Sequence, residues 1–374
     1  MLSFHRNAST VRFDDPAKKR PSLSTMVDVA KRANVALSTV SYALNGTRPI
    51  SAETRERIFK AMKDLGYRPH ALARGLASKR SRIIALLFPV SERGLGYTEL
   101  EFVTSAADAA REKGYNLVLW PSEMHDPNEL LQFTQQGLVD GLIVMEVRMN
   151  DERINLLREI EFPFSMIGRC ADTTGISYVD IDFERTIQDA VQYLAGLGHK
   201  HLAFLNQSQA AFEAGYGPVV RVNAEFPKAI QAAGVEGKAR FCRSTQQAGF
   251  EACTKLFAES PDMTALITMN ESAIPGILRA ITAQQYKIPE DFSVLVIASS
   301  VRVAEMITPT LTTSDIAATQ LARQSVELLI QQLEAEKGEV FQELVPCRLT
   351  VRGSTGPCLQ NPDQQMARNS SQAQ

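Results

Sequence analysis

A short stretch near the N-terminus carries side chains whose chemistry suits nucleic acid. Hydroxyl and amide groups recur there at helical spacing, separated by the apolar residues Val40, Ala43 and Leu44. Groups of this kind hydrogen-bond to phosphate oxygens and to base edges in the major groove. A helix surface with only a structural role would carry more Glu and Lys. The candidate DNA-reading residues of this stretch are Ser38, Thr39, Ser41, Tyr42 and Asn45.

Three short helices must position these residues. Thr25 and Asp28 are spaced as a capping box, which predicts that a first helix begins after Thr25. Residues 34–36 predict a break, residues 37–44 a second helix, and Ser51 the N-cap of a third. Three helices with a tight turn between the first two describe a helix-turn-helix, whose second helix enters the major groove. Its expected core consists of Val29, Ala30, Ala33, Val40, Ala43, Leu44, Ile58, Met62 and Leu65.

The charge of the chain is divided unevenly along its length. Residues 1–82 hold 17 Lys and Arg against 6 Asp and Glu, whereas the remainder holds 23 against 36. A basic module joined to an acidic body indicates an anionic polymer as the partner of the first part. The alternatives are a basic disordered tail and a helical hairpin without a ligand. Most of the basic residues, however, fall inside the helical pattern.

The segments outside the folded patterns have recognisable compositions. Residues 1–24 have no sustained apolar period and predict a disordered basic arm. Residues 69–81 are too short to be helical alone and contain Gly75, so we expect a hinge helix that orders only against a partner. Residues 356–374 are rich in Gln, Ser and Asn and lack apolar heptads, which predicts a disordered tail and a dimer rather than a tetramer.

From Arg82 onward, short apolar strands alternate with helices. This alternation predicts parallel, doubly wound sheets, and it occurs in two sets with a pause at residues 179–184. Two such layers in tandem predict two lobes with a ligand cleft at the carboxyl ends of their strands. The expected strands are 83–89, 116–121, 140–146 and 164–169 in the first set, and 201–206, 239–242, 265–269 and 292–298 in the second.

The sequence contains none of the motifs that would favour an enzyme. It lacks a P-loop, a G-x-G-x-x-G after a strand, H-E-x-x-H and G-x-S-x-G. His199 and His201 have no carboxylate or thiol ligands nearby, and the five cysteines are scattered, so we expect buried thiols and neither a metal site nor a cofactor. The absence of a secretory signal and of a membrane-spanning run predicts a cytoplasmic protein with no membrane partner.

Several motifs occur together in the N-terminal part. D-V-A-x-x-A-x-V-x-x-x-T-V-S-x-x-L-N spans residues 28–45, S-x-x-T-R-x-R-I spans 51–58, and L-G-Y-x-P-x-x-x-A-R-x-L spans 65–76. These motifs resemble the LacI/GalR family of bacterial transcription regulators. The resemblance implies that paired hinge helices of a dimer enter the minor groove, where Leu76 wedges between base pairs with Ala73 and Arg74 alongside. The other DNA-contacting positions that it implies are Thr25, Leu37, Ser51, Thr54 and Arg55.

The resemblance extends through the body to about residue 355. L-G-H-K-H at 197–201, A-L-I-T-M-N-E at 265–271 and P-T-L-T-T at 309–313 occur in the family's order. The implied fold is that of periplasmic sugar-binding proteins, with the chain crossing between lobes near Asp182, Thr312 and Gly338. Effectors of the family are mostly sugars or sugar phosphates, and less often nucleobases, held by carboxylates, amides and an arginine. The matching candidates at strand ends are Glu146, Arg148, Arg169, Arg221, Asn270 and Glu271, each of which could instead be a solvated loop residue.

Some positions depart from the family pattern. Ala36 stands where a Ser commonly caps the recognition helix, Tyr42 replaces a frequent Arg or His, and His70 replaces a common hinge Asn. These changes bear on which operator is read. In the cleft, the usual sugar-binding arginine falls at Val222, with Arg221 beside it, which puts ordinary hexose binding in doubt. Further departures are Glu225 for Gly, Glu271 for Asp, and Ala298 and Ser299 for a carboxylate.

We therefore expect an α/β protein: a helix-turn-helix headpiece and hinge helix, followed by a two-lobed periplasmic-binding-protein-like core of doubly wound parallel sheets. Its expected function is that of a homodimeric, ligand-responsive repressor of carbohydrate-use genes, binding palindromic double-stranded operator DNA on the nucleoid and a small sugar or sugar derivative. The alternative is a cytoplasmic sugar-binding module without regulatory DNA binding. The expected division is an arm (1–24), a DNA-binding domain (25–68), a hinge (69–81), an effector-binding and dimerisation core (82–355, with a first lobe of about 82–183 and 313–337 and a second of about 184–312 and 338–355) and a tail (356–374).

Overall fold

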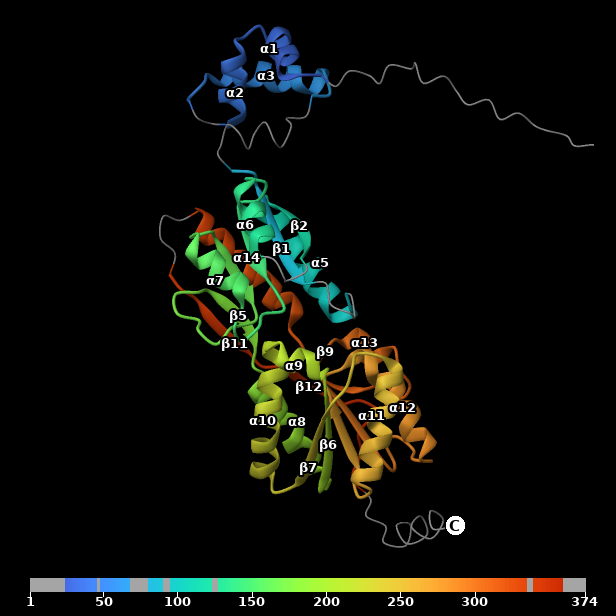
Figure 1. The fold of residues 1–374 in the computed structure, drawn as a ribbon. Helices are drawn as coiled ribbons and strands as arrows, with labels where there is room; N and C mark the ends of the chain where they lie inside the picture. Colours follow the sequence, from blue (N-terminus) through green and yellow to red (C-terminus); the bar gives the residue numbers. More distant parts are fainter. Residues whose placement is uncertain are drawn as a thin grey trace, which may run out of the picture. The chain divides into compact units, whose positions relative to one another are not determined.

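The computed structural model divides the chain into two compact units, residues 1–81 and 82–374, which are described separately below (Figure 1). We call the first unit the headpiece and the second the body. None of the helices in the described ranges is long and apolar enough to cross a bilayer. The residues that the structure describes are 24–45, 48–67, 80–89, 95–122, 127–334 and 339–358.

The headpiece consists of three helices, α1 (Met26–Ala33), α2 (Leu37–Asn45) and α3 (Ala52–Asp64). Thr25 and Asp28 form the predicted capping box, with the Thr25 amide donating to Asp28 Oδ2 at 2.8 Å. Asn34 adopts a left-handed φ of 53° and ends α1, and the Ser51 side chain accepts the Thr54 amide at the start of α3. The predicted helix-turn-helix is therefore confirmed.

Small and β-branched residues close the core of the headpiece. Val29, Val40 and Ile58, one from each helix, are fully buried, and alanines fill the space between them. Because alanine side chains are short, the three helix backbones can approach closely without a large core. The buried alanines are Ala30, Ala33, Ala43 and Ala61.

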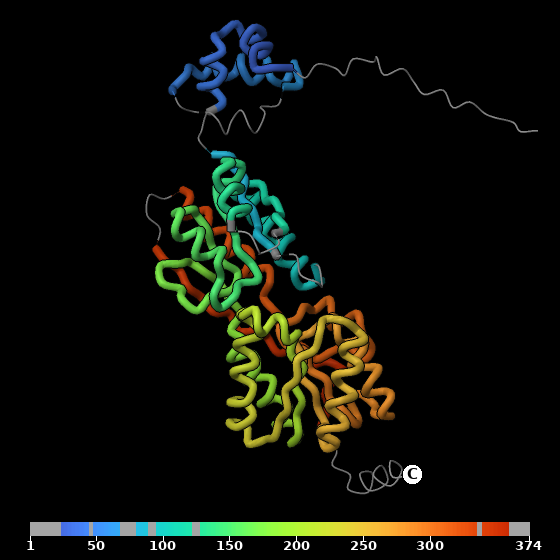
Figure 2. The backbone as a smooth tube through the Cα atoms, in the orientation of Figure 1, coloured from blue at the N-terminus to red at the C-terminus, as the bar shows by residue number. Residues whose placement is uncertain are grey.

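The body contains two six-stranded sheets, each of which defines a lobe (Figure 2). The first sheet has the order β11-β5-β4-β3-β1-β2 and is parallel throughout. The second has the order β12-β10-β9-β8-β6-β7, in which only β12 runs antiparallel to its neighbour among the strands described. The strands are β1 (Ile83–Pro89), β2 (Asn116–Ser122), β3 (Gly141–Val144), β4 (Phe164–Ile167), β5 (Tyr178–Ile181), β6 (His201–Asn206), β7 (Glu236–Phe241), β8 (Ala265–Thr268), β9 (Ser293–Ser299), β10 (Thr312–Asp315), β11 (Gln342–Val345) and β12 (Arg348–Thr350).

Helices cover both faces of each sheet, as predicted for a doubly wound architecture (Figure 1). In the first lobe, α5 (Tyr97–Glu112) and α14 (Ala318–Glu334) pack on one face, and α6 (Pro127–Gln135) and α7 (Glu152–Glu159) on the other. In the second lobe, α8 (Phe183–Gly196) and α10 (Gly217–Ala233) lie opposite α11 (Gln246–Glu259) and α12 (Ile274–Ala283). The shorter helices are α9 (Gln209–Glu213), η1 (Glu271–Ala273) and α13 (Val301–Glu305).

The chain crosses between the lobes at three places, two of which differ from the prediction. The first crossing, between β5 and α8, lies near Asp182 as expected. The second lies after Asp315 rather than near Thr312, because residues 312–315 pair with β9 in the second sheet. The third lies between β11 and β12 rather than near Gly338, because residues 342–345 extend the first sheet beside β5. The predicted lobe limits at 313–337 and 338–355 are wrong to that extent.

Residues 179–184, predicted as a pause in the alternation, contain most of β5 and the start of α8. The Val-Asp-Ile-Asp run alternates apolar and polar residues, which is the pattern of a strand, and its carboxylates hid that pattern.

The predicted C-terminal tail begins too early. Residues 356–358 are described: the Cys358 amide donates to the Leu197 carbonyl at 2.8 Å, and the Gly356 carbonyl faces His199 Nε2 at 3.2 Å. At the other end, Ser24 of the predicted arm donates to the Leu65 carbonyl. His199 is buried against hydroxyls and this carbonyl, and so serves the packing of the chain end.

All five cysteines are free thiols, and four of them are buried. Burial raises the pKa of Cys253 and of Cys347 to about 12, so these thiols stay protonated at neutral pH. The expectation of mostly buried thiols is confirmed.

Candidate functional site

The outer face of α2 presents the predicted reading residues. Ser38 is exposed, Thr39 and Ser41 are half-buried, and 47% of the Leu37 surface is accessible. The guanidinium of Arg48 lies over the Tyr42 ring, 5.2 Å from its centroid. No acidic side chain occurs on α2, so nothing on this helix repels a phosphate backbone. Asn45 ends α2, and its side chain lies outside the described part of the structure.

The other predicted DNA contacts of the headpiece lie at helix N-termini. Ser51, Thr54 and Arg55 are together in the first turn of α3, where the Ser51 hydroxyl donates to Thr54 Oγ1 at 2.8 Å. Thr25 is exposed at the start of α1. Helix N-termini carry partial positive charge and free amides, which favour phosphate. The hinge residues Ala73, Arg74 and Leu76 lie outside the described residues.

A cleft lies between the two lobes of the body. It encloses about 930 Å³ when its open mouth is included, which suits a small molecule rather than a polymer. Of the predicted effector residues, Glu146, Asn270 and Glu271 line it. Arg148, Arg169 and Arg221 do not, so this part of the predicted set is corrected.

Glu146 is held in the cleft by a buried ion pair. It follows β3 with a left-handed φ of 54°, a conformation that costs energy for a residue with a side chain. Arg153 donates to the carbonyls of Met145 and Glu146, both at 3.1 Å, and forms a two-point ion pair with Asp151 at 2.9 and 2.7 Å. The Glu146 carboxylate then accepts the Tyr216 hydroxyl at 2.8 Å. Arg153 and Asp151 thus fix the turn that presents Glu146.

Glu271 connects the two lobes. Its Oε1 accepts the hydroxyl of Thr98, on α5 of the first lobe, at 2.7 Å and that of Ser299, on β9 of the second lobe, at 2.6 Å. A change in the angle between the lobes must alter the Thr98 contact. The neighbouring Asn270 is almost fully buried, and its side-chain amide donates to the Cys242 carbonyl at 2.8 Å. Asn270 therefore positions the loop more than it offers donors to a ligand.

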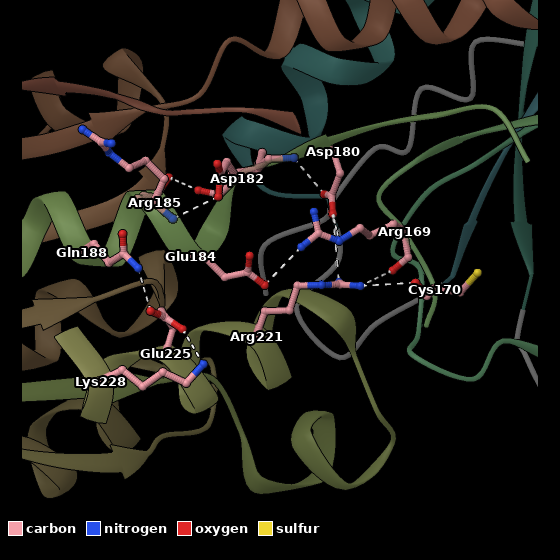
Figure 3. Close-up of polar contacts among 12 residues, drawn as sticks. Arg169, Cys170, Asp180, Asp182, Glu184, Arg185, Gln188, Arg221, Glu225 and Lys228 are labelled. Atoms are coloured by element: carbon pink, nitrogen blue, oxygen red, sulfur yellow. Dashed lines mark hydrogen bonds and ion pairs between the residues drawn. The ribbon is translucent and has the colours of Figure 1, made fainter. Parts of the chain in front are cut away.

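Arg169 and Arg221 meet at Asp180, behind the wall of the cleft (Figure 3). Asp180, on β5, is 4% exposed, and its Oδ2 lies 3.8 Å from Arg169 Nε and 4.0 Å from Arg221 Nη1. Burial raises the pKa of Asp180 to about 7, although the two guanidiniums oppose this shift. Arg221 Nη2 donates to the Arg169 carbonyl at 2.8 Å, and Arg169 Nη2 lies 3.3 Å from Glu184. The arginines thus join the lobes instead of lining the cleft.

The register of α10 explains this arrangement. Arg221 faces the first lobe, whereas Val222, at the position of the family's arginine, is fully buried in the hydrophobic core. Glu225, where the family pattern has Gly, accepts Gln188 Nε2 at 2.7 Å and Lys228 Nζ at 2.9 Å (Figure 3).

Comparison with known proteins agrees with both units. Residues 25–70 match the family described as bacterial regulatory proteins, lacI family, and residues 191–355 match a periplasmic binding protein-like domain. The chain belongs to the lacI family. Catabolite control protein A of Priestia megaterium is 27% identical to this lacI-family chain over 336 residues, covering 88% of this chain and 99% of that protein.

Two solved lacI-family structures resemble the chain over most of its length. The lac repressor dimer bound to operator and the anti-inducer ONPF matches with a TM-score of 0.76 and 25% identity, over 90% of this chain and 100% of that one. A complex of the transcriptional regulator CelR with cellobiose matches with a TM-score of 0.64 and 26% identity, over 88% and 99%. The lacI-family chain is a ligand-responsive, DNA-binding transcription regulator, not an enzyme.

Sequence reasoning missed several residues that line the cleft of this lacI-family protein. Asp180 belongs to the run interpreted as a pause, and the strand-like alternation of that run was the available signal. Thr98 and Glu99 come from the start of α5, which begins four residues before the predicted helix. Gln207 and Tyr216 flank the short helix α9, whose sequence carried no signal of a binding role.

Proposed function

We propose that this regulator is a homodimeric repressor of carbohydrate-use genes, which binds a near-palindromic operator on the nucleoid and a small sugar or sugar derivative in its cleft. The observation that carries the proposal is the position of Glu271, whose hydrogen bonds to Thr98 and Ser299 span the lobes at the cleft. A ligand that contacts Glu271 changes the relative free energies of the open and closed lobe arrangements. Effector binding and lobe angle are thereby coupled.

The proposed division of labour follows the domain limits expected from the sequence. Residues 25–68 read the half-site, with the outer face of α2 in the major groove and the N-termini of α1 and α3 on phosphates. Residues 69–81 pair with the same segment of a second chain in the minor groove. The lobes change the spacing of the two hinges, and this spacing controls operator affinity.

Exposed apolar residues on the body support a second copy as the partner. Tyr97 and Leu100 on α5 and Val301 on α13 are each at least 40% exposed, and α5 and α13 are in contact. Exposed apolar patches of this kind are typical of protein interfaces. The lac repressor, which resembles this chain, is a dimer on its operator. Two-fold symmetry of the dimer then requires a near-palindromic DNA site.

Binding to the DNA upstream of the protein's own gene tests the proposal. We expect sequence-selective binding whose affinity falls steeply with salt, with a log–log slope of about −0.9 for each neutralised phosphate. Fluorescence anisotropy with overlapping labelled fragments, repeated at several salt concentrations, measures both quantities. A purified protein that binds all upstream fragments equally weakly contradicts the proposal and favours the alternative of a sugar-binding module.

The hinge is tested by Leu76→Ala. We expect operator affinity to fall by about 1–3 kcal/mol, because the variant loses the side chain that unstacks the central base step. Affinity for the effector should not change, since Leu76 contacts only DNA. Leu138→Ala, which removes an exposed leucine from the body, is the control. An equal loss of DNA and effector affinity in Leu76→Ala contradicts the proposed role of the hinge.

A further inference from the structure

The charge of the cleft lining is one-sided. Among the lining residues that the structure describes, four carry carboxylates and none is a lysine or an arginine. The carboxylates come from both lobes, so they converge on the same space. They are Glu99, Glu146, Asp180 and Glu271.

The two arginines nearest to the cleft act elsewhere. Arg169 lies 3.8 Å from Asp180 and 3.3 Å from Glu184, and Arg221 lies 4.0 Å from Asp180 and donates to a backbone carbonyl (Figure 3). Two guanidiniums therefore face two carboxylates behind the wall. Neither guanidinium approaches Glu271.

Two of the lining glutamates lie close to each other. Glu99 Oε2 and Glu271 Oε2 lie 2.5 and 3.9 Å from the point that a Cβ on Gly96 would occupy. The hydrogen bonds printed on Glu271 come from the neutral hydroxyls of Thr98 and Ser299, which leave its negative charge in place. Like charges at this range raise each other's energy, and a cation between them removes that cost.

We propose that the effector carries a primary ammonium group, as an amino sugar does, and that this group binds between Glu99 and Glu271. The inference rests on the proposed function of the cleft and assigns its ligand class. The rings of Phe102, Phe183 and Tyr216 line the same cleft and provide apolar surface for the body of such a ligand. An organic cation fits better than a metal ion, since the described residues contain no group of three side chains able to hold a metal.

Three matched probes test the charge preference: D-glucosamine, D-glucose and D-glucose 6-phosphate. Each is titrated into the full-length protein and followed by isothermal titration calorimetry and thermal shift, in low salt. We expect glucosamine to bind about 10- to 1,000-fold more tightly than glucose, and glucose 6-phosphate to be rejected. Equal or tighter binding of glucose or the phosphate overturns the proposal. So does the absence of any shift with glucosamine and with a wider set of primary amines at tens of millimolar.

Glu271→Gln separates charge from shape. The amide oxygen can still accept from Thr98 and Ser299, so the lobes keep their contact, but affinity for glucosamine should fall about tenfold or more while glucose binding stays unchanged. Glu251→Gln, on the exposed side of α11, should change neither. Unchanged glucosamine affinity in Glu271→Gln overturns the assignment.

Operator binding measured on the same preparations keeps the two proposals apart. A protein that binds its operator but prefers neutral glucose retains the proposed function and loses the ammonium assignment. A protein that binds glucosamine without selective DNA binding shows the reverse.

Discussion

Ile58→Ala should abolish sequence-selective DNA binding while leaving the body folded. Ile58 is fully buried where α3 meets α1 and α2. Truncation of a buried isoleucine to alanine costs about 2–5 kcal/mol, through lost burial and the cavity left behind. A headpiece of three short helices, with a core made largely of alanines, has little stability to lose. We therefore expect the headpiece to be mostly unfolded in this variant at 25 °C.

Calorimetry and DNA binding together check this expectation. The headpiece transition should move to lower temperature or vanish, and the transition of the body should stay in place, because the two units have separate cores. Phe59→Ala is the matched control, since the neighbouring side chain is 47% exposed and its loss should cost little stability. If Ile58→Ala retains operator affinity, the assignment of DNA reading to the headpiece is wrong.

Arg153→Met should destabilise the body by about 3–5 kcal/mol, because it strands a buried carboxylate. Asp151 is 2% exposed, and Arg153 supplies it with two charged hydrogen bonds. The same guanidinium donates to the carbonyls of Met145 and Glu146, which have no replacement donor in the variant. We also expect weaker effector binding, since Glu146 loses the support of its strained turn.

Arg158→Met on the same helix is the control for Arg153→Met. Arg158 pairs with Asp172 at 3.1 Å, but both side chains are at least 40% exposed, and such surface pairs contribute about 0–1 kcal/mol. Chemical denaturation of the two variants beside the parent protein measures the difference. Equal stability of the two variants would show that burial does not strengthen the Arg153 pair.

The acid limb of the stability curve gives a second readout of the Arg153 pair. Burial acts to raise the pKa of Asp151, but hydrogen bonds from Arg153 and from backbone amides outweigh it and hold the pKa below its ordinary value. A carboxyl with a depressed folded-state pKa contributes stability that is present above its unfolded pKa and is lost as pH falls through the folded pKa. The parent protein should therefore lose more stability than Arg153→Met as pH falls below about 4.

The headpiece was predictable because its signals are local. A capping box, a serine N-cap and apolar residues three to four apart are each formed within one or two helical turns. The hydrogen bonds that they imply form between residues close in the chain, so no distant partner can change them. The three helices accordingly lie where the sequence placed them.

The body was predictable in class but not in its connections. Alternating strands and helices indicated two doubly wound sheets, yet the short polar strands β10 and β11 could not be assigned to a lobe from their residues. Their lobes depend on which strand edge accepts them, β9 for one and β5 for the other. That pairing joins residues far apart in the chain, so only the folded sheets decide it.

The sequence by itself determined that this chain has a DNA-reading headpiece and a two-lobed ligand-binding body, and that Glu146 and Glu271 are cleft residues. Only the tertiary structure decided which arginines face the ligand. Adjacent helical residues point about 100° apart, so the step from Val222 to Arg221 exchanges the hydrophobic core for the lobe interface. Asp180 then draws Arg221 and Arg169 behind the wall, because a buried carboxylate needs partners more than an open cleft does.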